Sequence, residues 1–363
     1  MKTLEDIKKI AVLGAGTMGP GIAQIFAMGG YDVTMWTRRE ETRENAKKTL
    51  YKSLQTFAEE DLIAADKIDE IYSRVSFKLT VKECVEGADF IMETIVENKD
   101  AKLELYAKVD ACVSDDAIIA SNTSGLDIFA LVPARRLPQM VIAHWYAPPQ
   151  LIPLVEVVKG ELAPQEFCDV TVALLEKCGK TAVPMKKFIR GYIANRMQMC
   201  LNQEVFFLLD NGYCTPEDID KAVKASFIPR AVVLGLCKRA DFGGLDMTAN
   251  NYKNKSYEAP PPVDMPTSLA ELVDKGELGF KTGKGFYDYP PKPAKKTLWP
   301  GLKDLYPQKA PEDVDVEDLE GADDDLAEEG EGTLAGDVDE EDEDVYDEDE
   351  RPASTAARAA TPQ

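Results

Sequence analysis

Short apolar runs alternate with segments of helical spacing at the start of the chain. Residues 7–13 predict a buried strand, and Ile22, Ile25 and Phe26 then recur at helical spacing until a Gly-Gly pair. Another apolar run, at residues 33–36, predicts a second strand. A strand, a helix and a strand within about 30 residues are typical of a parallel βαβ unit.

This alternation continues to about residue 187. Four further apolar runs predict strands at residues 90–92, 118–120, 140–142 and 154–158. Between them, the charged residues 41–72 predict a helical hairpin that projects from the sheet. Strands that alternate with helices predict a doubly wound α/β sheet, so we assign residues 1–187 to one α/β domain.

The pattern changes near residue 188. Residues 191–210 have helical periodicity, and the sequence Thr-Pro-Glu-Asp at residues 215–218 is typical of a helix N-terminus with a capping box. No strong strand pattern follows as far as about residue 285. We therefore predict a second, smaller and all-helical domain at residues 188–290.

The negative charge is concentrated at the C-terminal end. The net charge is −23, and residues 311–363 hold 23 of the 65 acidic residues but only two basic ones. Because so few apolar residues accompany this charge, residues 291–363 are predicted to be a disordered acidic tail. The remaining chain is nearly neutral and lacks clustered Lys and Arg, so we expect no nucleic-acid partner.

Other compositional features bound the class of protein. The chain has no apolar run long enough for a membrane helix and no apolar core of a signal peptide, so we expect no membrane partner and a cytoplasmic location. The seven cysteines are widely spaced and form no Cys-x-x-Cys motif. We therefore expect neither a disulfide framework nor a metal site.

A glycine-rich loop joins the first predicted strand to its helix. Gly14, Gly16 and Gly19, with Thr17 and Met18 between them, form a Gly-x-Gly-x-x-Gly motif in this strand-to-helix position. The glycines suit a tight turn, close approach of a pyrophosphate and close packing of the helix, and the helix N-terminus attracts phosphate. The motif predicts a Rossmann-type domain that binds NAD(P).

The end of the second predicted strand bears on the choice of dinucleotide. NAD sites usually have an Asp or Glu here for the ribose 2′-hydroxyl, whereas this chain has Thr37, Arg38 and Arg39. Because these three positions hold no carboxylate, nothing there would repel a 2′-phosphate, and two guanidinium groups could bind it. This favours NADP over NAD, with the alternative that both arginines are merely solvated.

The single histidine, His144, follows a predicted strand, and Glu156 lies within the next one. A turn at the intervening Pro-Pro would place these strands side by side, with Glu156 in reach of His144. Histidine suits removal of a hydroxyl proton, and a carboxylate would stabilise its charged form. The spacing alone leaves open a core histidine beside an unrelated glutamate.

Several ordered motifs in residues 6–290 resemble those of the 3-hydroxyacyl-CoA dehydrogenases. They are residues 121–124 (SNTS), 144–149 (HWYAPP), 152–157 (IPLVEV), 191–196 (GYIANR), 240–246 (ADFGGLD) and 283–287 (GKGFY). The resemblance implies hydride transfer between NAD(P) and a short-chain 3-hydroxyacyl-CoA in fatty acid metabolism, with the small-molecule substrate in the helical domain. It also implies a homodimer formed through that domain.

The resemblance also implies roles for individual residues. His144 is the acid/base, Glu156 orients it, and Ser124 and Asn195 bind the reacting oxygen or the acyl carbonyl. The positions that serve the nicotinamide half of the cofactor are Glu93, Lys102 and Asn122.

Three departures from the family pattern keep alternatives open. The family usually has Asn where this chain has Ala147, an acid at Thr37, and Pro at Arg190. One alternative is a dehydrogenase of a free L-3-hydroxy acid, similar to the gulonate or carnitine enzymes. The other is a catalytically weak nucleotide-binding scaffold.

Overall fold

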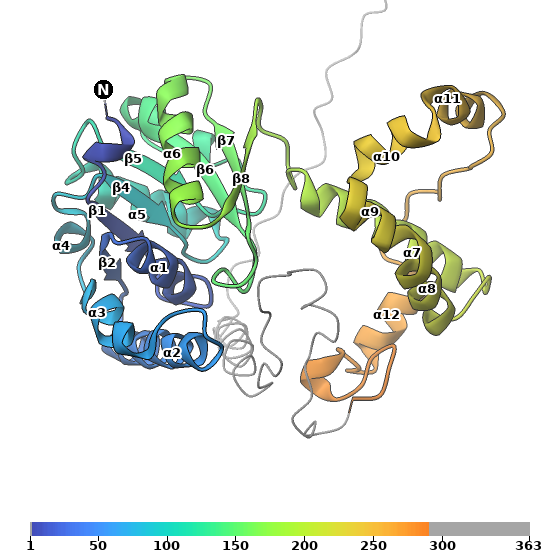
Figure 1. Ribbon diagram of the computed structural model, residues 1–363, viewed down its shortest axis with the longest axis horizontal. Coiled ribbons are helices and arrows are strands. Elements are labelled where there is room, and N and C mark those ends of the chain that lie inside the picture. The colour runs from blue at the N-terminus through green and yellow to red at the C-terminus, as the bar shows by residue number, and fades with distance from the viewer. Residues whose placement is uncertain (1, 290–363) are drawn as a thin grey trace, which may run out of the picture.

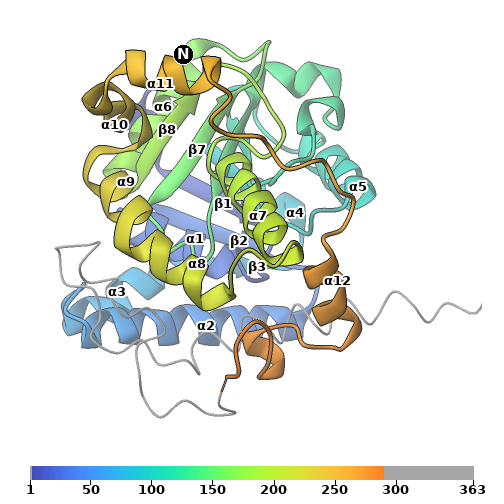
Figure 2. The same cartoon turned by 90° about the vertical axis from the view of Figure 1, so that its right-hand side faces the viewer.

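The computed structural model describes residues 2–289 (Figure 1). A sheet flanked by helices comes first in the chain, and a group of helices follows to one side of it (Figures 1 and 2). The acidic tail that the sequence predicts to be disordered lies outside the described residues.

The sheet has eight strands in the order β3-β2-β1-β4-β5-β6-β7-β8. Neighbouring strands are parallel except for β6 and β7, which are antiparallel. The strands are β1 Lys9–Leu13, β2 Asp32–Trp36, β3 Val75–Lys78, β4 Phe90–Glu93, β5 Ile118–Ser121, β6 Met140–Trp145, β7 Leu154–Lys159 and β8 Thr181–Met185. All six strands predicted from the sequence are present, whereas β3 and β8 were not predicted.

Helices cover both faces of this sheet. They are α1 Gly19–Met28, α2 Glu40–Glu59, α3 Ile68–Ser73, α4 Val81–Val85, α5 Lys99–Asp110 and α6 Gln165–Lys177. Along β1, Ile10 and Val12 belong to one buried apolar cluster, while Ala11 and Leu13 belong to another on the opposite face. This alternation buries both faces, and it confirms the predicted doubly wound α/β fold.

The charged segment after β2 forms the predicted helical hairpin. Ala46, Leu50, Leu54 and Phe57 lie on one side of α2 and are buried, and the helix packs against α1 and α3. The opposite side of α2 carries its many charged side chains. A single apolar stripe therefore fixes a helix that is polar over most of its surface.

The second part of the chain is helical, as predicted. Its helices are α7 Ala194–Asp210, α8 Pro216–Ala222, α9 Ile228–Leu234, α10 Leu236–Gly243, α11 Leu245–Lys253 and α12 Thr267–Asp274. The predicted capping box at α8 is present, since Thr215 accepts a hydrogen bond from the Asp218 N–H. Between residues 190 and 289 the structure contains isolated β-bridges but no strand. Within residues 2–289, none of the helices has the length and apolarity that crossing a bilayer requires.

Candidate active site

The glycine-rich loop runs from the carboxyl end of β1 to the N-terminus of α1. Gly14 has φ of 124°, and a Cβ there would lie 2.6 Å from the Thr94 carbonyl oxygen. A Cβ on Gly19 would lie 2.0 Å from the Gly14 carbonyl oxygen. A Cβ on Gly16, by contrast, would meet nothing within 4 Å. The first and third glycines thus allow close packing, and the exposed middle one leaves room for a phosphate group, as a dinucleotide requires.

Thr37, Arg38 and Arg39 lie beside this loop. The Gly14 N–H donates to the Trp36 carbonyl at 3.1 Å, which joins the loop to the end of β2. Thr37 is buried and its N–H donates to the Lys78 carbonyl, whereas both arginines are exposed at the start of α2. The sequence therefore presents two cations, and no carboxylate, directly after this strand.

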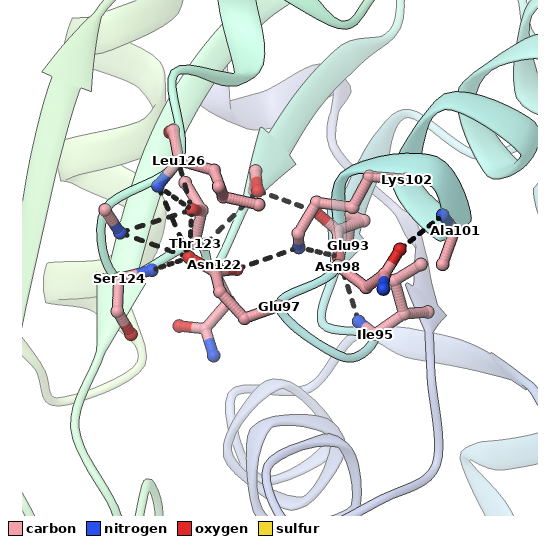
Figure 3. Close-up of polar contacts among 12 residues, drawn as sticks. Glu93, Ile95, Glu97, Asn98, Ala101, Lys102, Asn122, Thr123, Ser124 and Leu126 are labelled. Carbon is pink, nitrogen blue, oxygen red and sulfur yellow. Dashed lines mark hydrogen bonds and ion pairs between the residues drawn. The ribbon is translucent and has the colours of Figure 1, made fainter. Parts of the chain in front are cut away.

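Glu93, the last residue of β4, and Lys102, near the start of α5, form a buried ion pair (Figure 3). Their side chains are 0% and 1% exposed, and Lys102 Nζ lies 2.7 Å from Glu93 Oε1. Glu93 also accepts hydrogen bonds from the hydroxyls of Tyr106 and Ser121, at 2.9 and 2.6 Å. The ion pair and these bonds offset the cost of burying the charges. Glu93, at the end of β4, thus connects this strand to α5 and to the end of β5.

Glu97, which the sequence analysis did not single out, organises the loop after β5 (Figure 3). Its Oε1 accepts hydrogen bonds from the Thr123 hydroxyl at 2.5 Å and from the Ser124 and Gly125 N–H groups at 2.9 and 3.1 Å. Its other oxygen lies 3.4 Å from Lys102 Nζ. Burial alone raises the pKa of Glu97, but these contacts outweigh it and lower the pKa below its ordinary value. An ionised carboxylate therefore holds this loop.

His144 and Glu156 face each other on adjacent antiparallel strands, β6 and β7. His144 Nδ1 lies 3.1 Å from Glu156 Oε2, and both side chains are buried. The chain turns between these strands through a cis peptide bond from Ala147 to Pro148. The two residues that the sequence placed side by side are thus in direct contact.

Glu156 is also tied to the helical part of the chain. Its Oε1 accepts hydrogen bonds of 2.9 Å from the N–H groups of Ile193 and Ala194, at the start of α7. Burial by itself raises the pKa of Glu156, but the hydrogen bonds that it accepts lower the pKa below its ordinary value of 4.5. Because Asn195 follows directly, this arrangement brings the first turn of α7 to the His144–Glu156 pair.

Two tyrosine rings flank His144. The ring centroids of Tyr146 and Tyr192 lie 4.6 and 4.8 Å from that of His144. The Tyr146 hydroxyl donates to Glu156 Oε2 at 2.8 Å, and the Tyr192 hydroxyl donates to the Thr123 carbonyl at 2.7 Å. Neither tyrosine was singled out from the sequence, although Tyr146 stands two residues after His144, directly beyond the end of β6.

The loop after β5 joins the same assembly. Asn122 Oδ1 accepts a hydrogen bond of 2.8 Å from the Trp145 N–H, directly after His144. Ser124 is exposed, and its backbone is fixed by Glu97. The carboxyl ends of the parallel strands lie at one edge of the sheet, so the glycine loop, Ser124 and His144 share that edge. Ligands bind at this edge in open α/β sheets.

Comparison with known proteins identifies the family. Residues 9–188 match the family model described as the 3-hydroxyacyl-CoA dehydrogenase NAD binding domain, and residues 191–289 match that family's C-terminal domain. The chain belongs to the 3-hydroxyacyl-CoA dehydrogenase family. Its members are NAD-dependent oxidoreductases that act on CH–OH groups, so the predicted family and enzyme class are confirmed.

Individual relatives agree with this assignment. The probable 3-hydroxybutyryl-CoA dehydrogenase of Bacillus subtilis is 35% identical over 78% of this chain and 98% of its own length. The crystal structure of (S)-3-hydroxybutyryl-CoA dehydrogenase PaaH1 from Ralstonia eutropha has a TM-score of 0.65 at 28% identity and covers 78% of this chain and 99% of its own. A 5-formyl-3-hydroxy-2-methylpyridine 4-carboxylic acid 5-dehydrogenase, described as an NAD⁺-dependent dismutase, has a TM-score of 0.70 at 29% identity, covering 78% and 92%.

Proposed function

We propose that this dehydrogenase transfers hydride between NAD(P) and C3 of a short-chain acyl-CoA, the carbon that carries the hydroxyl or keto oxygen. His144 is the proposed acid/base. The buried contact between His144 Nδ1 and Glu156 Oε2 carries this proposal. It provides one titratable ring, fixed in orientation by one carboxylate, at the edge of the sheet that also holds the glycine loop.

The proton chemistry of the pair fits both directions of the reaction. In oxidation, neutral His144 takes the hydroxyl proton, and in reduction its charged form returns a proton to the carbonyl oxygen. Because Nδ1 faces Glu156, Nε2 is the nitrogen that exchanges the proton with substrate. The carboxylate stabilises the charged ring and fixes its tautomer. A bound nicotinamide supplies the hydride acceptor or donor.

Two polar side chains near this pair suit the substrate oxygen. Ser124 lies on the loop held by Glu97, and Asn195 lies in the first turn of α7 beside the N–H groups that bind Glu156. Each can donate a hydrogen bond to the reacting oxygen or to the acyl carbonyl. We assign them these roles.

The cofactor-binding residues fall into two groups. The loop of Gly14, Gly16, Thr17, Met18 and Gly19 is proposed to hold the pyrophosphate, since its middle glycine leaves open space. The second group, proposed to serve the nicotinamide half of the cofactor, consists of Glu93, Lys102 and Asn122. Burial and internal partners indicate that Glu93 and Lys102 act there by positioning loops rather than by touching the cofactor.

We also propose a preference for NADP within this NAD-binding fold. Thr37 is buried at the end of β2, while Arg38 and Arg39 are exposed next to it. A 2′-phosphate would meet two cations there and no carboxylate directly after the strand. The related 5-formyl-3-hydroxy-2-methylpyridine 4-carboxylic acid 5-dehydrogenase is NAD⁺-dependent. For this chain, kcat/KM measured with NADH and with NADPH would determine the cofactor preference.

A homodimer through the helical domain is the oligomeric state that we propose. None of the residues in α7–α12 is buried in a single copy of the chain. Val233, Phe242 and Tyr252 are 79%, 85% and 84% exposed. Exposed apolar surface on this scale is typical of an interface, and a second copy would bury it. Sedimentation of the full chain measures the oligomeric state directly.

The cytoplasmic location stays a prediction.

Turnover assays test the proposed reaction. Reduction of acetoacetyl-CoA with NADPH and with NADH should proceed, faster with NADPH, while free 3-hydroxy acids should be poor substrates for oxidation. Oxidation of free acids in preference to the CoA thioester would establish the alternative substrate class. Binding of either nucleotide without turnover of any of these compounds would establish the scaffold alternative.

A further inference from the structure

We infer that Tyr146 is a positioning residue of the active site. Its hydroxyl reduces the stabilisation that the Glu156 carboxylate gives to protonated His144. This inference rests on the proposed acid/base role of His144. Its basis is that the Tyr146 hydroxyl and His144 Nδ1 contact the same carboxylate oxygen, Glu156 Oε2, at 2.8 and 3.1 Å.

The hydroxyl and the imidazole compete for the charge of one oxygen. A hydrogen bond from a neutral donor disperses negative charge on the acceptor, so the carboxylate stabilises an adjacent cation less strongly. Tyr146 stays a donor, because burial and the nearby Glu156 charge raise its pKa above its ordinary value. The N–H groups of Ile193 and Ala194 donate to the other oxygen, Oε1, and these two bonds do not involve Tyr146.

The consequence concerns the balance between the two proton states of His144. Without the Tyr146 hydroxyl, Glu156 would favour the charged ring more strongly, and oxidation, which needs the neutral ring, would require a higher pH. With the hydroxyl present, the neutral ring stays available at lower pH. Tyr146 therefore sets the pH range in which His144 can work as a base.

Two further titratable groups lie near the pair, Tyr192 and Glu97. The Tyr192 ring also packs against His144, but its hydroxyl donates to the Thr123 carbonyl and not to Glu156. Burial and the charge of Glu97 raise the pKa of the Tyr192 hydroxyl above its ordinary value. Tyr192→Phe is therefore a matched control, since it also removes one hydroxyl from a ring that flanks His144.

The chain offers a direct readout, since His144 is its only histidine. The full-length protein, prepared without a histidine tag and with isotope-labelled histidine, gives one imidazole signal by NMR. Its titration midpoint should rise by roughly 0.5–1 pH unit in Tyr146→Phe. It should stay at the wild-type value in Tyr192→Phe. The acidic limb of kcat/KM for alcohol oxidation should move in the same direction.

The outcomes separate this inference from the proposed function. An unchanged or lowered midpoint in Tyr146→Phe, or an equal rise in Tyr192→Phe, overturns the role of Tyr146, whatever the turnover. Absent turnover of acetoacetyl-CoA overturns the proposed function, whatever the NMR result. If Tyr146→Phe does not fold, 3,5-difluorotyrosine at position 146 keeps the ring and donates more strongly. The midpoint should then fall, and a rise or no change rejects the role.

Discussion

Glu97 and Ser124 are 27 positions apart in the sequence, yet the carboxylate of Glu97 accepts a hydrogen bond of 2.9 Å from the Ser124 N–H. The same oxygen binds the N–H groups of Gly125 and Leu126. The side chain that follows β4 therefore shapes the loop that follows β5. This makes the position of the proposed substrate-binding serine dependent on a residue with no assigned part in the chemistry.

Replacing Glu97 by Ala should impair turnover through that loop. The loop N–H groups would lose their acceptor, and a shift of about 1 Å in a positioning residue can cost on the order of 10²-fold in rate. We expect kcat/KM for acetoacetyl-CoA to fall by roughly 10- to 100-fold. Glu161→Ala, which alters an exposed glutamate in the turn after β7, is the control. Equal kinetics in both variants would refute the role.

Replacing His144 by Ala should remove most of the activity. General acid/base help is worth ~10²–10⁴-fold, so kcat should fall by about that factor in both directions. Nucleotide binding, measured by the fluorescence of the reduced cofactor, should persist because the glycine loop is unaltered. A variant with a near-normal rate excludes His144 as the acid/base.

Replacing Thr37 by Asp should change the choice of cofactor. A carboxylate at the end of β2 can accept a hydrogen bond from a ribose 2′-hydroxyl and repels a 2′-phosphate. We expect the ratio of kcat/KM for NADH to that for NADPH to rise by roughly 10- to 100-fold, as for hydrogen bonds to charged groups. Thr49→Asp introduces the same charge at an exposed position of α2 as a control. An unaltered ratio at Thr37 contradicts the proposed NADP preference.

Local patterns predicted much of this fold because the information was local. The strand, glycine loop and helix from residue 7 onward need only short-range periodicity. His144 and Glu156 could be paired because only a short turn separates their strands. The edge strands β3 and β8 escaped prediction, since an edge is less buried and tolerates Pro184 inside β8. Their short, partly exposed sequences carry little apolar signal.

Non-local polar contacts were the part that periodicity could not supply. Glu97 resembles any exposed glutamate in sequence, and only the folded sheet brings it to the loop of Ser124. Glu93 was assigned to the nicotinamide half of the cofactor through the family resemblance, and that role stays a prediction. Its contacts with Lys102, Tyr106 and Ser121 come from other elements, so periodicity could not predict them.

The hydrogen bonds to Glu156 predict a pH-dependent share of the stability. The folded pKa of Glu156 lies below its ordinary value of 4.5. A depressed carboxyl pKa adds stability that is fully present above the unfolded value and is lost as the pH falls through the folded pKa. Glu156→Gln cannot ionise, so wild type should exceed it in free energy of unfolding by more at about pH 7 than at about pH 3.

Urea denaturation of both proteins at the two pH values measures this difference. Gln also changes the contacts to the Ile193 and Ala194 N–H groups, so the two proteins differ in stability at any pH. The change in that difference between the two pH values is therefore the quantity that reports on the ionised carboxylate. Asp169→Asn, which changes an exposed carboxylate on α6, controls for the general effect of removing one negative charge. If the gap between wild type and Glu156→Gln is the same at both pH values, the ionised carboxylate does not stabilise the junction of β7 with α7.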